Sequence, residues 1–151
     1  MNSSRNILSL FILLLFLQAC IGPQKPPENL LSLTEAQMKI RSYQTRTFDA
    51  KDSNEVLRAV TSALLDLGFI IERANAPMGL VTAGKFAGDG FSGFVEISVI
   101  VRSAGTKQTE VRANALFNAK PIEDPKVYQN FFTTVERSLF VTRSSKPTGN
   151  D

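Results

Sequence analysis

Cysteine and histidine, the residues most often used for nucleophilic and metal chemistry, are nearly missing from this chain of 151 residues. The chain has no histidine and one cysteine, at position 20. A disulfide, the usual general base and the usual zinc ligand are therefore excluded. We expect no metal and no other cofactor. The thiol of Cys20 is the one group whose chemistry needs an explanation.

Serines and carboxylates are numerous, but their spacing matches no catalytic motif. The body has no Ser-x-x-Lys signature, and its acidic residues are scattered over predicted caps, loops and outward strand positions. The segment Gly84–Gly90 resembles a phosphate loop only superficially, because no Ser or Thr follows Lys85. The sequence therefore predicts a protein that is not an enzyme and has no catalytic residues. A Ser–Lys pair distant in sequence stays open.

The residues before Cys20 have the layout of a secretory signal peptide. Arg5 supplies a positive charge, and the apolar run that follows, Ile7–Leu17, is shorter than the roughly 20 residues that span a membrane. Leu17-Gln18-Ala19-Cys20 resembles the lipobox of bacterial lipoproteins. That resemblance implies cleavage after residue 19 and acyl chains, palmitate among them, on Cys20.

The residues after Cys20 bear on the anchor and its location. The alternative, an uncleaved anchor helix, is disfavoured because the prolines of Ile21-Gly22-Pro23-Gln24-Lys25-Pro26-Pro27 interrupt helices. Ile21 stands where an Asp would retain a lipoprotein in the inner membrane. By resemblance to the enterobacterial sorting rule, this implies the periplasmic face of the outer membrane in a Gram-negative host.

Composition divides the mature chain into a tether, one domain and a tail. Residues 20–40 form the lipidated start and a Pro-rich tether, residues 41–141 form the domain, and residues 142–151 form a flexible polar tail. Leu30, Leu31 and Leu33 either pack on the domain or lie on lipid. Thr34–Gln37 has the pattern of a capping box and predicts a short helical turn.

Hydrophobic periodicity predicts an α+β domain with the order β-α-β-β-β-β-α. The predicted strands are 41–49, 69–73, 80–86, 94–103 and 108–117, and the predicted helices run from 52 or 53 to 67 and from 124 to 141. Both helices carry an apolar stripe, and the last two strands alternate apolar and polar residues. We therefore expect a mostly antiparallel sheet with both helices packed on one face.

Two local motifs carry a resemblance to a known family. A helix ends in Leu67-Gly68-Phe69, and the strand segment Gly79-Leu80-Val81-Thr82 follows soon after. This resembles the domains of BamC-like (NlpB-type) lipoproteins and a larger pool of uncharacterised lipoproteins with Arg-x-Phe-Asp, here Arg46–Asp49, before that helix. The resemblance covers roughly residues 41–140. BamC-type proteins carry two such domains, whereas this chain has room for one.

Two surfaces are candidates for binding a partner. The outward side chains of the last two strands include Glu96, Ser98, Arg112 and Asn114, and we expect Glu96, Glu110 and Arg112 to form cross-strand pairs. The glycine-rich segment 87–93 and its flank carry Phe91 and Phe94. These rings either insert into a partner or lipid surface or fold back onto the sheet edge.

The expected function follows from the anchor and the lack of catalytic residues. With 17 basic and 14 acidic residues and no basic run, the chain is not expected to bind nucleic acid. We predict a non-catalytic accessory or scaffold protein of a cell-envelope assembly, with the membrane and an envelope protein as its partners. The alternative is a carrier of a small apolar ligand held between helices and sheet.

Overall fold

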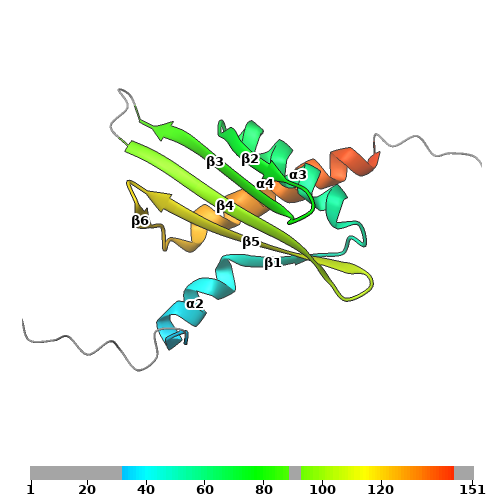
Figure 1. The fold of residues 1–151 in the computed structure, drawn as a ribbon, viewed down its shortest axis with the longest axis horizontal. Helices are drawn as coiled ribbons and strands as arrows, with labels where there is room; N and C mark the ends of the chain where they lie inside the picture. Colours follow the sequence, from blue (N-terminus) through cyan, green and yellow to red (C-terminus); the bar gives the residue numbers. More distant parts are fainter. Residues whose placement is uncertain (1–31, 89–92, 145–151) are drawn as a thin grey trace, which may run out of the picture. The chain divides into compact units, whose positions relative to one another are not determined.

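Six strands and three helices make up the part of the chain that the structure, a computed structural model, describes: residues 32–88 and 93–144 (Figure 1). The strands are β1 (Thr45–Phe48), β2 (Ile70–Asn75), β3 (Leu80–Ala87), β4 (Gly93–Ala104), β5 (Gln108–Phe117) and β6 (Lys120–Pro121). The helices are α2 (Glu35–Tyr43), α3 (Ser53–Asp66) and α4 (Pro125–Ser144). The predicted signal peptide, Cys20 and most of the tether lie outside the described residues.

The strands form one antiparallel sheet in the order β1-β5-β4-β3-β2, with β6 added beside β5. Three hairpins join β2 to β5 in sequence. The first strand crosses to the far edge and pairs with β5, so that Thr45 lies opposite Arg112. The predicted class, α+β with a mostly antiparallel sheet, is confirmed.

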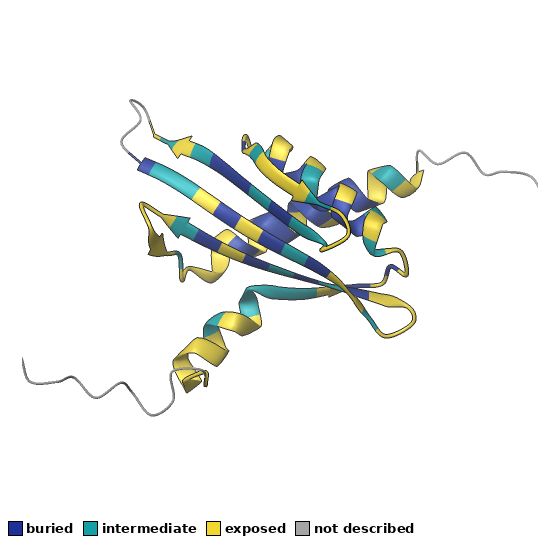
Figure 2. Ribbon diagram, viewed as in Figure 1, coloured by how far each residue is buried: buried dark blue, intermediate teal, exposed yellow. Residues whose placement is uncertain are grey.

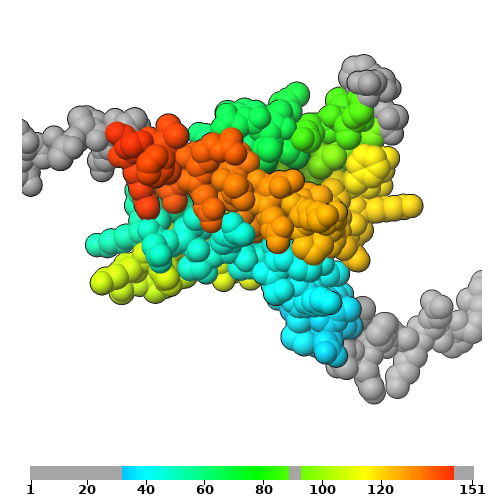
Figure 3. All heavy atoms as spheres, turned by 180° about the vertical axis from the view of Figure 1, so that it is seen from behind, coloured from blue at the N-terminus to red at the C-terminus, as the bar shows by residue number. Residues whose placement is uncertain are grey.

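Both α3 and α4 lie on one face of the sheet, and Figure 3 shows them from that side. Their apolar stripes meet the inward residues of the strands, among them Val81, Val99 and Val111, which are fully buried. Burial of such side chains supplies most of the stability of a domain of this size. The alternation of apolar and polar side chains along β4 and β5 therefore determines which face of the sheet the helices cover.

Local signals explain where α3 begins and ends. The side chain of Asp52 accepts a hydrogen bond from the Asn54 amide at 2.9 Å and caps the N-terminus. Gly68 follows the helix with φ +79°, and the Phe69 amide donates to the Leu64 carbonyl in a Schellman motif. The amine of Lys85 donates to the carbonyl of Leu67 at 2.9 Å. Lys85 therefore helps to cap a helix and lies in β3, outside any phosphate-loop geometry.

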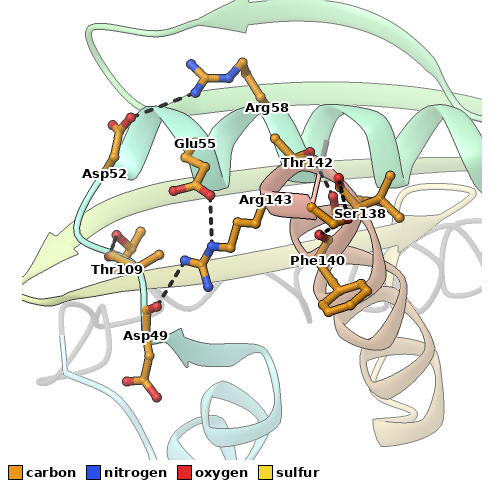
Figure 4. A network of polar contacts seen from close by, with 12 residues as sticks. Asp49, Asp52, Glu55, Arg58, Thr109, Ser138, Phe140, Thr142 and Arg143 are labelled. Atoms are coloured by element: carbon orange, nitrogen blue, oxygen red, sulfur yellow. Dashed lines mark hydrogen bonds and ion pairs between the residues drawn. The ribbon is translucent and has the colours of Figure 1, made fainter. Parts of the chain in front are cut away.

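The C-terminal turn of α4 is held by a polar network (Figure 4). The guanidinium of Arg143 donates to Glu55 at 2.9 Å and to the backbone carbonyl of Asp49 at 3.1 Å. Thr109 donates to the carbonyl of Ala50 at 2.7 Å and fixes the same loop. The helix consequently continues to Ser144, beyond the predicted end at 141.

The hydroxyl of Tyr128 bridges a gap along the edge of β5. It donates to the carbonyl of Ile122 at 2.7 Å and accepts from the amide of Ala115 and the side chain of Gln44 at 3.3 and 3.0 Å. Strand β1 pairs with one end of β5 and β6 with the other. Tyr128 therefore satisfies backbone groups that neither short strand reaches.

The predicted order and the count of two helices are wrong, because α2 precedes the first strand and the short β6 follows β5. The capping box at Thr34 and Gln37 is present, but it opens a helix that continues to Tyr43. The Tyr43 hydroxyl donates to the carbonyl of Glu123 at 2.9 Å, and partial burial, together with the charge of Glu123, raises the pKa of this phenol. The first strand accordingly starts at Thr45 and not at Arg41. Within the described residues, no helix has the length and apolar character needed to cross a bilayer.

Candidate functional site

The second face of the sheet, which we call the open face, is covered by no helix of the described residues (Figures 1 and 2). Along β4, Ile97 and Val99 are buried against the helices, whereas the alternate residues Glu96 and Ser98 are exposed. Side chains of a strand alternate between faces, so every second residue of β3, β4 and β5 belongs to the open face, whereas a register shift between Ile71 and Arg73 interrupts the alternation in β2.

The four predicted strand residues share this face. Ser98 lies directly opposite Asn114, Glu96 is opposite Leu116, and Arg112 is opposite Ile100. Glu96, Ser98 and Asn114 are exposed, whereas Arg112 is half-buried. The structure therefore brings these side chains together on adjacent strands, and whether they bind a partner remains a prediction.

Phe94 lies on the open face and packs back onto the sheet. Its ring lies 5.1 Å from that of Phe86, centroid to centroid, and it occupies the space over Gly84. A Cβ on Gly84 would approach the Phe94 ring to 2.5 Å, so only glycine fits beneath the ring without a shift. Phe91 lies outside the described residues.

A shallow hollow of about 320 Å³ lies on the open face over β2, β3 and β4. Its polar lining consists of Glu72, Arg73, Thr82, Glu96 and Ser98. These carboxylates and hydroxyls, with the guanidinium of Arg73, can form hydrogen bonds and ion pairs with a bound molecule.

The predicted cross-strand ion pairs are wrong. Arg112 pairs with Glu110 of its own strand at 3.4 Å and donates to the hydroxyl of Thr45 on β1 at 3.3 Å. Glu96 has no basic group within ion-pair distance among the described residues. In the sheet register, Arg102 and not Arg112 lies opposite Glu110. The long side chain of Arg112 extends toward β1 instead.

Several residues of this face were missed from the sequence. Ile70 and Phe86 are 71% and 57% exposed. Ile70 lies opposite Gly84, the glycine that is covered by the Phe94 ring. Alternation in the predicted strand 80–86 carries the signal, because the buried residues Val81 and Ala83 place Phe86 on the other face. An apolar end of the open face, formed by Ile70, Phe86 and Phe94, therefore adjoins the polar hollow.

A second hollow, of about 270 Å³, lies between the start of α3 and the β2–β3 turn, with Asn54, Met78 and Arg102 among its lining. Across residues 32–88 and 93–144, no three Cys, Asp or Glu side chains gather closely enough to hold a metal ion.

No protein-family model matches the chain, and no curated protein matches it either. Among solved structures, the chain is similar to a chain of the adenylate sensor from AMP-activated protein kinase, solved in complex with the ribofuranotide ZMP. The two are 13% identical over 63% of this chain and 94% of that chain, with a TM-score of 0.45. A likeness at this level says nothing about what the present chain binds.

Proposed function

We propose that this protein is a lipid-anchored accessory protein of the cell envelope that binds a protein partner through the open face. The observation that carries the proposal is the exposed apolar end of that face beside an unpaired carboxylate, Glu96. Apolar side chains rimmed by polar ones are typical of protein interfaces.

The anchor rests on the residues before and at Cys20. A short apolar run followed by Leu17-Gln18-Ala19-Cys20 supports cleavage and acylation at the thiol. Two or more acyl chains bind a bilayer stably, whereas one binds only marginally. The proposed place is the periplasmic face of the outer membrane. The BamC-like assignment stays a prediction.

The open face is suited to binding a protein because it offers both apolar and polar contacts on a rigid surface. Its backbone is held in the sheet, so little ordering is required when a partner docks. Ile70 and Phe86 supply exposed apolar area, and Ser98 and Asn114 supply hydrogen-bonding groups.

A carrier of an apolar ligand is the alternative, and no observation favours it. The layer between helices and sheet holds large side chains that are almost fully buried, Leu64, Tyr128 and Phe132 among them. The larger of the two hollows described above lies on the open face, and the other opens at the end of the layer, with Leu57 and Val101 in its lining.

Photo-crosslinking in intact cells tests the proposed function. A photoreactive amino acid at Asn114 reports on the open face, and the same group at Thr133, exposed on α4, is the matched control. We expect a discrete adduct in the membrane fraction from position 114 and none from position 133, and we expect Cys20→Ser to abolish it. Equal adducts from both positions, or none from 114, would refute the use of this face.

A further inference from the structure

The residues of β4 that face the open side carry opposite charges toward the two ends of the strand. A second β4 running in the opposite direction would therefore present a complementary charge at each end. In order, the outward residues are Phe94, Glu96, Ser98, Ile100 and Arg102. Glu96 and Arg102 carry opposite charges at equal distances from the point between Ser98 and Ile100. Both are exposed, and neither pairs with an opposite charge among the described residues.

The other charges on the open face are two of each sign, and one pair of them forms an ion pair. Glu110 and Arg112 form an ion pair at 3.4 Å. Glu72 and Arg73 are consecutive residues of β2 at the edge of the sheet, and both line the same hollow. Glu96 and Arg102 are the charges that β4 itself contributes to this face, and neither forms an ion pair among the described residues, although Arg102 lies opposite Glu110 in the register.

Two copies of the face fit together about a twofold axis. The axis lies in the plane between the two sheets, across β4 and level with the space between Ser98 and Ile100. Rotation by 180° places Glu96 of each copy opposite Arg102 of the other, which gives two identical ion pairs. This is an isologous contact, the usual form of a homodimer interface.

The distances permit these pairs. Packed sheets lie about 10 Å apart, and their strands cross at about 30°. Glu96 and Arg102 are about 20 Å apart along the strand, so each lies about 10 Å from the axis. At that distance, a crossing angle of about 30° separates the two β4 strands sideways by about 5 Å. The side chains of a glutamate and an arginine span this separation together.

Apolar residues lie where such a contact would be driest. Ile100 sits beside the axis and is opposite Leu80 on β3, and both are half-buried in the single chain. A second copy would remove them further from water, and removal of apolar area is the main driving force for association.

We infer that the chain forms a symmetric dimer in which the open faces stack and Glu96 of each copy pairs with Arg102 of the other. The inference rests on the proposed function in one respect, the use of the open face as an interface, and it names a second copy as the occupant. It does not depend on the lipid anchor.

Charge reversal tests the dimer through sedimentation equilibrium of the purified full chain in a density-matched detergent. Wild type should dimerise, more weakly as salt rises. Glu96→Arg and Arg102→Glu should each raise the dissociation constant at least about tenfold, because like charges then face each other twice. The double variant should restore the dimer, and an equimolar mixture of the two single variants should form a heterodimer.

Arg137→Glu, an exposed reversal on α4, is the matched control and should leave the dimer unchanged. Far-UV circular dichroism checks that each variant is folded, and rescue by the double variant excludes misfolding as the cause. A monomeric wild type, or a dimer unaffected by both single reversals, overturns the inference. If position 114 still crosslinks to a different envelope protein, the inference fails while the proposed function stands.

Discussion

A single hydroxyl, that of Tyr128, satisfies backbone groups at the gap between β1 and β6. Tyr128 is buried, and its oxygen makes three hydrogen bonds, to Ile122, Ala115 and Gln44. Removing one partner from a buried network leaves the others unsatisfied, which costs more than the bond itself contributes.

We therefore expect Tyr128→Phe to lower the free energy of unfolding by about 1–3 kcal/mol in a denaturant titration. Tyr43→Phe is the matched control, because its hydroxyl makes one bond, to Glu123, at an exposed site, and its loss should lower the free energy of unfolding less than Tyr128→Phe does. An equal effect of the two substitutions would contradict the bridging role of Tyr128.

The turn between β5 and β6 holds a strained alanine. Asn118 and Ala119 both have positive φ, 48° and 62°, and they join the paired residues Phe117 and Lys120. Two-residue hairpin turns of this type favour Asn-Gly, since an L-residue with a Cβ is strained there.

Ala119→Gly should consequently raise the free energy of unfolding by about 1 kcal/mol, visible as a melting temperature a few degrees higher. Ala104→Gly, at the end of β4 where φ is not positive, should lower it by about 0.5–1 kcal/mol. Stabilisation by both or by neither would argue against strain at residue 119.

Residue-level contacts were the least predictable part of the site. Alternation placed Glu96, Ser98, Arg112 and Asn114 on one face, because the side-chain period of a strand follows from backbone geometry alone. The partner of Arg112 did not follow from alternation, since a long side chain can reach Thr45 on one strand or Glu110 along its own.

At the scale of elements, the last turn of α4 depends on contacts made outside the helix. Arg143 ties it to Glu55 at the start of α3 and to the carbonyl of Asp49. Helix ends fray unless such contacts hold them.

Arg143→Ala should increase amide hydrogen exchange in residues 140–144 while lowering global stability by only about 0.5–1 kcal/mol, because the ion pair is partly exposed. Arg137→Ala, which removes an exposed side chain from the same helix, should leave exchange in residues 140–144 unchanged. Unaltered protection of these amides in the Arg143 variant would show that the last turn is stable without the Arg143 contacts.

Long periodic elements were predictable and short ones were not. The stripe of α3, its Asp52 cap and Gly68 predicted the helix closely, and β5 has its predicted bounds. By contrast, α2 has no buried residue and therefore no apolar stripe, so its capping box was the one sequence signal that indicated a helix. β6 has two residues, too few for any periodicity, and is defined by pairing with β5.

At the scale of the whole molecule, a predicted anchor precedes a domain whose sheet has one covered and one open face. Helices α3 and α4 bury one side of the sheet, and no helix of the described residues covers the other. An anchor confines copies to one membrane surface, which raises their effective concentration for a weak contact between open faces.

The intact mass of the protein purified from native membranes tests the anchored placement most directly. We expect a chain that begins at Cys20, lacks residues 1–19 and carries the mass of a diacylglyceryl group with or without a further acyl chain. A chain that retains its first nineteen residues and bears no lipid would contradict the account.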